Sequence, residues 1–149
     1  MRLYMNYIDR TELLNDAPDG FYDGVEDNRL DRMINYASAL MRRETRGALY
    51  SVDEAGMPTN EQIRDAFKYA PSAQVQAWVE ADITDQLDTG GATSEALVAS
   101  SSNNGSSVTM DYSESTKARE HLLGGGLALG AMLLLEDAGL MSGKPWLVV

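Results

Sequence analysis

DNRLDRMINYASALMRRETR, residues 27–46, carries the clearest helical pattern in the chain. Its apolar side chains recur at spacings of three and four, which predicts one buried stripe on an amphipathic helix: Leu30, Met33, Ile34, Ala37, Leu40 and Met41. Asp27 or Asn28 can cap the first turn, and Gly47 ends the helix. Three arginines in the last turns suit the negative end of the helix dipole: Arg42, Arg43 and Arg46.

The same period predicts two more long helices downstream. Residues 59–81 begin with a capping box of Thr59 and Gln62 and contain Pro71, which predicts a kink or a break. Residues 115–139 form the last helix, which Gly139 ends. Leucines spread around much of its circumference, so we expect burial on several sides, by its own fold or by neighbouring subunits.

Shorter signals precede and interrupt these helices. Residues 8–14 are predicted to form a short helix capped by Asp9 or Thr11, and residues 17–20 a turn. Gly126 and Gly130 lie four residues apart in the last predicted helix, where small residues would let another helix approach closely.

Two segments are predicted to lie outside the helices. Residues 82–114 read as a flexible loop because their Gly/Ser/Asn-rich clusters cannot build a packed core. Short β-prone runs flank the second cluster, which favours a loose hairpin; order against a partner and plain disorder both remain open. Residues 143–149 read as an extended tail with an apolar end, and an exposed apolar patch is typical of a binding site.

The composition agrees with one all-α domain over residues 1–149. Hydrophobic residues make up 44% of the chain and aromatic residues only 7%, so Leu, Ala, Ile and Met must supply much of the core. These side chains lose little rotamer freedom in a helix. We therefore expect a small helical bundle with a long Gly/Ser-rich loop or loose hairpin and an extended tail.

The net charge of −11 limits the partners of the chain. Binding to phosphates gains affinity from Lys and Arg, so neither nucleic acid nor an anionic membrane is an expected ligand. Residues 9–31 are the most acidic tract, with eight acids and two arginines. The acidity either serves solubility alone or forms walls that repel DNA sliding past them.

The sequence holds few residues suited to catalysis or to metal binding. There is no cysteine and one histidine, His121, without a partner at metal-ligand spacing. The triplet Gly124–Gly126 lacks the Lys and Ser/Thr of a phosphate-binding loop. The pair Asp82 and Asp85 leaves open a metal-dependent hydrolase or nuclease. We predict no catalytic, cofactor or metal residues and no enzymatic activity.

No segment resembles a signal peptide, and the longest apolar stretch, residues 122–135, is too short to span a bilayer. We expect a soluble protein made in the cytoplasm.

Residues 30–47, LDRMINYASALMRRETRG, resemble the opening helix of head-to-tail adaptor proteins of tailed bacteriophages. In that family an apolar helix with an Ala-Ser centre ends in a Thr-Arg-Gly-like stop. A loop ending in Gly56-Met57-Pro58-Thr59 follows, and residues 63–66 and 73–78 look like the family's second helix. The resemblance covers residues 27–81 well and extends more weakly to the last helix.

This resemblance implies a structural protein of the virion neck. It implies a ring, commonly a dodecamer, that docks on the portal protein and extends the DNA channel. The ring would present a surface to the next connector, stopper or tail protein, and DNA would pass through without specific binding. Loop and chain-end residues would grip the portal: Val108, Met110, Trp146, Leu147, Val148 and Val149.

We expect the contacts between subunits to involve the arginines at the end of the first long helix, which would pair with acidic residues of a neighbouring subunit: Arg42, Arg43 and Arg46. A second function of another class remains open. A small helical regulatory or adaptor module would bind a host or phage protein at one-to-one stoichiometry and need no portal.

Overall fold

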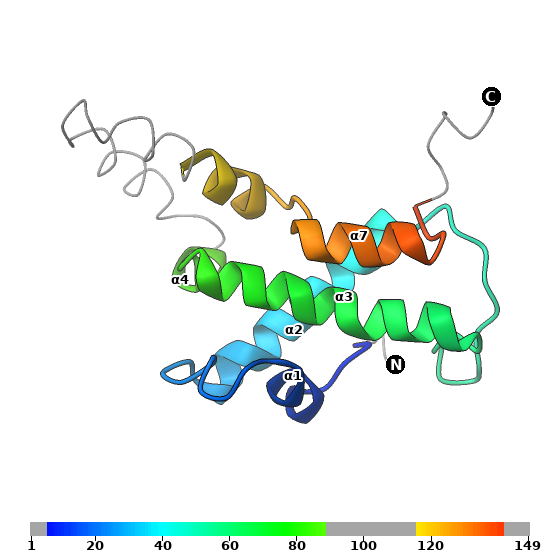
Figure 1. The fold of residues 1–149 in the computed structure, drawn as a ribbon, viewed down its shortest axis with the longest axis horizontal. Helices are drawn as coiled ribbons and strands as arrows, with labels where there is room; N and C mark the ends of the chain where they lie inside the picture. Colours follow the sequence, from blue (N-terminus) through cyan, green and yellow to red (C-terminus); the bar gives the residue numbers. More distant parts are fainter. Residues whose placement is uncertain (1–5, 89–115, 142–149) are drawn as a thin grey trace.

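The computed structural model describes residues 6–88 and 116–141, which form helices joined by loops (Figure 1). The all-α class is confirmed: the described residues contain no strand, and one isolated antiparallel bridge joins Val52 to Pro58. The helices are α1 Arg10–Asp16, α2 Asp27–Glu44, α3 Glu61–Glu80, α4 Thr84–Asp88 and α7 Leu129–Asp137, and residues 116–123 form a further helical segment.

Helix α3 lies at the centre of the bundle. It packs against α2 on one side and α7 on the other, while α1 contacts both α2 and α3 (Figure 1). The core between these helices consists of fully buried apolar side chains, among them Leu13, Leu30, Met33, Ile34, Met41, Phe67, Val75 and Leu135. The apolar stripe predicted for α2 is confirmed, because all six of its residues are buried.

The ends of α2 differ in detail from the prediction. Glu26, and not Asp27 or Asn28, occupies the N-cap position, and its side chain makes no capping hydrogen bond. The helix ends at Glu44, two residues before the predicted end, and the hydroxyl and N–H of the C-cap residue Thr45 both donate to the Met41 carbonyl, at 2.8 and 3.0 Å. Arg46 and Gly47 lie in the turn that follows.

The predictions for α3 were wrong at two positions. Asn60, not Thr59, caps the helix by accepting from the Ile63 N–H at 3.1 Å. The Thr59 N–H instead donates to the Ser51 carbonyl across the loop. Pro71 does not break the helix, which runs unbroken from Glu61 to Glu80 (Figure 1). Because helices pack on both sides of α3 and bury Pro71 completely, packing outweighs the missing backbone hydrogen bond.

The predicted loop over residues 82–114 begins with a short helix instead. Helix α4, Thr84–Asp88, contacts α2, and the buried Ile83 side chain anchors it to the core. An ion pair between Arg29 and Asp85 joins the two helices. The rest of the predicted loop, with Val108 and Met110, and the predicted tail over 143–149 lie outside the described residues.

A short first helix and the turn after it are confirmed, although α1 covers residues 10–16 and not the predicted 8–14. Asp9 caps α1 and forms a capping box with Glu12, whose side chain accepts from the Asp9 N–H at 3.2 Å. In the turn after α1, Gly20 has a φ of +78° and the Phe21 N–H donates to the Pro18 carbonyl.

Tyr22 follows this turn and is buried against Phe21, with the two rings 4.9 Å apart in a T-shaped arrangement. Its hydroxyl has no hydrogen-bond partner among the described residues. Burial raises the pKa of Tyr22 above its ordinary value, and the nearby Asp16 charge raises it further. Because the pKa of Tyr22 is higher in the folded than in the unfolded state, the contribution of this neutral side chain to the free energy of unfolding is fully present below pH 10. The contribution is lost as the pH rises above the unfolded-state pKa.

We predict that Tyr22→Phe leaves the free energy of unfolding at pH 7 unchanged or raises it by up to about 1 kcal/mol, because it removes a buried hydroxyl without a partner. Between pH 10 and 12 the variant should lose less stability than the wild type. Urea unfolding across this range measures both. Parallel pH profiles for the two chains would show that Tyr22 does not cause the alkaline loss.

Candidate docking surface

The predicted single helix over residues 115–139 is divided in two by its glycines, and this division sets the position of α7. Residues 116–123 end at Gly124, and α7 begins at Leu129. Gly125 has a φ of +90°, a conformation that favours glycine, and the Gly126 N–H donates to the His121 carbonyl at 2.8 Å. Gly139, with a φ of +75°, ends α7 as predicted.

Gln74 makes two hydrogen bonds to the backbone between this break and the start of α7. Its side chain is fully buried on α3; the amide nitrogen donates to the Gly126 carbonyl at 3.2 Å, and the amide oxygen accepts from the Ala128 N–H at 2.7 Å. Ala128 is the N-cap residue of α7, and its own side chain offers no capping bond. One glutamine therefore satisfies the backbone where the helix is interrupted and fixes the start of α7 on α3.

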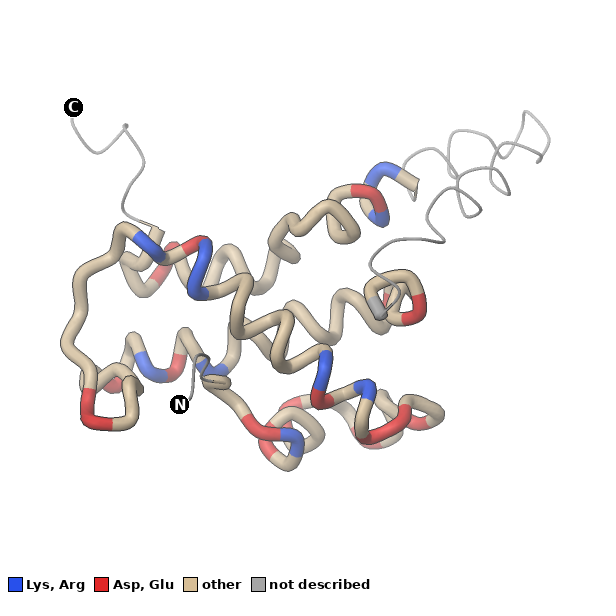
Figure 2. Tube along the Cα trace, turned by 180° about the vertical axis from the view of Figure 1, so that it is seen from behind, with Lys and Arg blue, Asp and Glu red and all other residues tan. Residues whose placement is uncertain are grey.

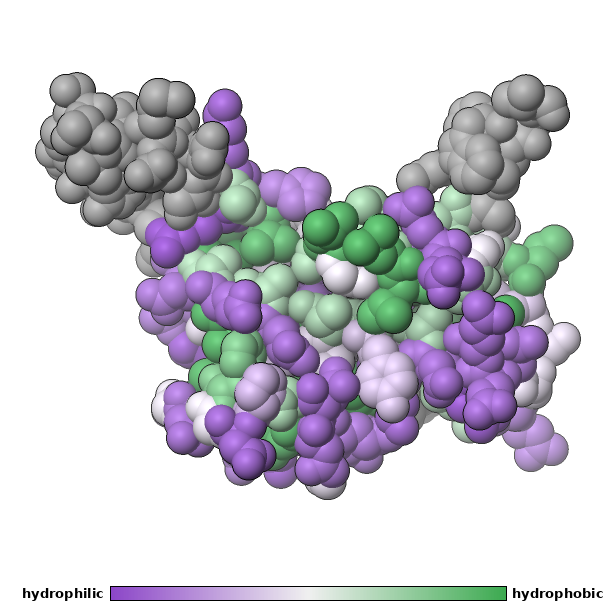
Figure 3. All heavy atoms as spheres, viewed as in Figure 1, coloured by the Kyte–Doolittle hydropathy of each residue, from purple (hydrophilic) through white to green (hydrophobic). Residues whose placement is uncertain are grey.

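Helix α7 buries only one of its sides within the described part of the chain. Ala131 and Leu135 are fully buried against α3, whereas Leu129 is 66% exposed, Leu133 54% and Leu134 37%. The described residues of the chain therefore do not bury α7 on several sides. The leucines form an apolar patch over α7 that polar residues border (Figure 3). Such a patch is typical of a surface that contacts another polypeptide.

A groove of about 730 Å³ runs between this patch and α3. Gly130 faces Ala73 of α3, and a Cβ at this position would lie 3.4 Å from the Ala73 Cβ, at the edge of ordinary van der Waals contact. Gly126, its predicted partner, lies in the break and not on a helix. The groove combines small and apolar side chains with two acids: Ala73, Gly130, Leu133, Leu134, Glu136 and Asp137.

The three arginines proposed for subunit contacts have different surroundings. The Arg42 guanidinium lies over the Tyr7 ring, 5.8 Å from its centroid. Arg43 donates to the Gly125 carbonyl at 2.5 Å and pairs with Glu44 at 2.8 Å, so it helps to hold the break after residues 116–123. Arg46 is exposed in the turn after α2. Their role between subunits remains a prediction.

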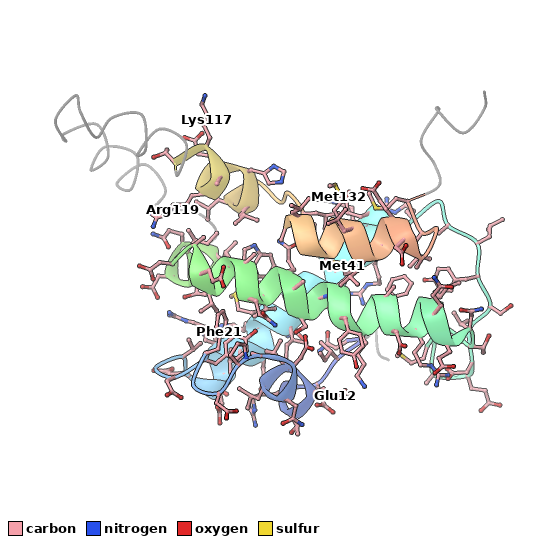
Figure 4. All side chains as sticks on the ribbon, viewed as in Figure 1. Glu12, Phe21, Met41, Lys117, Arg119 and Met132 are labelled. Atoms are coloured by element: carbon pink, nitrogen blue, oxygen red, sulfur yellow. The ribbon has the colours of Figure 1, made fainter. Side chains whose placement is uncertain are left out.

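The acidic tract of residues 9–31 is partly used within the fold, along α1 and the loop after it (Figure 2). Asp31 pairs with Arg10 at 3.1 Å, and Asp16 accepts from the Ser72 hydroxyl at 2.5 Å. Glu12, labelled in Figure 4 on the side of α3 opposite Lys117 and Arg119, pairs with Lys68 and raises the pKa of that amine. These acids position α1 against α2 and α3.

Asp82 and Asp85, the acids suggested for a metal, lie just after α3 and in α4. Asp85 is ion-paired with Arg29, and no group of three or more His, Asp or Glu side chains between residues 6–88 and 116–141 is placed to hold a metal ion. The Nε2 atom of His121 lies 3.0 Å from the Leu127 carbonyl oxygen on the protein surface. A second groove, between α1 and α2, contains both acids and arginines, including the paired Arg10 and Asp31.

Comparisons with family models, curated proteins and solved structures found no match to this chain. None of the helices in the described ranges has the length and apolar character needed to cross a membrane.

The residue that sequence reasoning missed is Gln74. It falls four residues after Ala70 and four before Trp78, on the apolar side of α3, where a polar residue signals a buried hydrogen-bond partner. The sequence pattern predicts that the exposed leucines of α7 lie on a helix. It does not predict which of them face outward, because that depends on the break at Gly124–Gly126.

We predict that Gln74→Leu lowers the free energy of unfolding by roughly 2–4 kcal/mol, since each of two buried backbone groups left without a partner costs roughly 1–3 kcal/mol. Amide hydrogen exchange in α7 should also become faster, because the helix loses its N-terminal attachment. Denaturant unfolding and exchange mass spectrometry measure these effects.

Gln76→Leu is the matched control on the same helix. Gln76 is half-buried and donates only to the Ser72 hydroxyl one turn earlier. The control should change stability by less than about 1 kcal/mol. Equal losses for the two variants would contradict the role given to Gln74.

Proposed function

We propose that the chain is a structural subunit of the neck of a tailed bacteriophage. It assembles as a ring on the portal protein, extends the DNA channel and links the head to the next connector, stopper or tail protein. The observation that carries this proposal is the exposed leucine face of α7, a surface suited to burial against another subunit. The resemblance over residues 27–81 adds to it, because that range contains α3, the helix against which α7 packs.

A ring requires two unlike patches on every subunit, since its contacts are heterologous and close on themselves. The α7 face supplies one patch, through Leu129, Leu133 and Leu134. For the other patch the exposed Arg46 is the best placed of the three arginines, because Arg42 and Arg43 already contact their own chain. Repetition of one modest contact around a ring raises the avidity without new interactions.

The charge of the chain also suits a channel. With a net charge of −11, a ring carries carboxylates that repel DNA and let it slide without sticking. The grip on the portal is assigned to residues outside the described ranges: Val108, Met110, Trp146, Leu147, Val148 and Val149.

The mass of the purified chain in solution, alone and mixed with the portal of its virus, tests this function. We expect a monomer alone and a stoichiometric ring on the portal. Leu133→Asp combined with Leu134→Asp should reduce incorporation at least tenfold, because losing one buried leucine contact costs roughly 1.5–3 kcal/mol. Multi-angle light scattering gives the stoichiometry.

Leu14→Asp is the control, since Leu14 is 44% exposed on α1 and lies outside the α7 face. It should join the ring as the wild type does. A wild-type monomer that ignores the portal would refute the adaptor function and favour a one-to-one regulatory module. Normal ring formation by the double variant would refute the role of α7 alone.

A further inference from the structure

The loop after α2 carries the most exposed large apolar side chain of the described part of the chain. Leu49 is 98% exposed, although leaving water is favourable for a leucine side chain. Arg46, three residues earlier, is exposed as well. Residues 46–49, which we call the contact loop, therefore present a cation and an apolar side chain within a short stretch. A single exposed leucine is common on protein surfaces, so the backbone that holds it matters.

The structure fixes this backbone on both sides of Leu49. Before it, Thr45 is buried, and the Thr45 carbonyl accepts from the Ala48 N–H at 2.9 Å. After it, the Tyr50 ring packs against the buried Phe67 ring of α3, with the two centroids 5.2 Å apart. A loop that is already held in place loses little conformational entropy when a partner buries its exposed side chain. Leu49 is thus preorganised to contact another surface.

The groove between α3 and α7 has the complementary chemistry. Its volume of about 730 Å³ has room for an incoming side chain, because Ala73 and Gly130 are small. Leu133 and Leu134 line that room with apolar atoms. Asp137, the last residue of α7, adds an exposed carboxylate at one end. The groove therefore suits a leucine with a cation close to it in sequence, which is what the contact loop offers.

The contact loop does not fill the groove of its own chain, since Leu49 is almost fully exposed. The loop that joins α2 to α3 runs along one edge of the molecule in Figure 1, whereas the α7 face is turned toward the viewer in Figure 3. The two surfaces are thus unlike and separate, as a heterologous contact between copies requires. Copies with a net charge of −11 repel one another, and a cation in the contact loop offsets part of that repulsion.

We propose that the contact loop of one copy docks in the groove between α3 and α7 of the next copy. Leu49 packs against Leu133 and Leu134. Arg46 pairs with Asp137. Each copy uses its loop toward one neighbour and its groove toward the other, so the contact propagates in one direction and can close into a ring. This inference rests on the proposed function, because it names a second copy of the chain as the partner of the α7 face.

Paramagnetic nuclear magnetic resonance of the free chain at high concentration, without portal, tests this contact and detects weak association. The chain has no cysteine, so Val52→Cys accepts one nitroxide label at a half-exposed position near Leu49 and leaves that leucine in place. The labelled chain is mixed with wild-type chains whose leucine methyl groups are observed. We expect the label to broaden the methyl signals of Leu133 and Leu134, but not those of Leu14, which is 44% exposed on α1.

Variants test the apolar and the charged parts separately. Leu49→Asp in the spin-labelled chain should reduce the broadening about tenfold, because burial of one leucine changes a binding constant by at least that factor. Arg46→Asp in the spin-labelled chain should reduce it about threefold, since an exposed ion pair contributes less. Asp137→Arg in the observed chain should then restore the broadening. A label at Leu14→Cys is the control and should leave Leu133 and Leu134 unbroadened.

Two results would overturn the proposal: no broadening at Leu133 and Leu134, or broadening that Leu49→Asp does not change. Either result in a chain that still joins the portal as a ring would refute this contact and leave the adaptor function standing. Conversely, the expected broadening in a chain that ignores the portal would support the contact between copies and refute the adaptor function.

Discussion

The pair of hydrogen bonds from Gln74 is the interaction on which the outer half of this fold depends. A glycine triplet inside an otherwise apolar helical pattern interrupts the helix and leaves backbone groups without partners. Gln74 supplies one donor and one acceptor from the neighbouring helix, at Gly126 and Ala128. Because Ala128 is the N-cap residue of α7, the Gln74 side chain sets where that helix starts and which of its leucines point outward.

The sequence predicted the elements whose cause is local. The stripe of α2, a cap at Asp9 and the stop at Gly139 each depend on residues within a few positions of one another. The sequence did not predict features that depend on contacts with residues far away in the chain. Packing on both sides keeps α3 unbroken through Pro71, and the partner that makes a break at Gly124–Gly126 tolerable lies on α3, about fifty residues earlier.

The candidate surface was predictable only in part. A leucine-rich last helix that needs partners follows from the pattern, whereas its division and the orientation of Leu129, Leu133 and Leu134 follow from the tertiary contacts. The acids were likewise visible as a tract. Only the fold shows that several of these acids hold α1 in place, through contacts with Arg10, Lys68 and Ser72. An acidic chain with an apolar helix face is, on our account, built to join other polypeptides.

Footprinting of α7 by hydroxyl radicals, with and without the portal, tests that account most directly. Radicals modify exposed side chains, and Leu129 and Leu133 are the most exposed leucines of the helix. We predict that both become protected when the chain joins the portal, while the exposed Leu14 on α1 keeps its reactivity. Unchanged modification of Leu129 and Leu133 in the assembled complex would contradict the central claim that α7 is the contact surface.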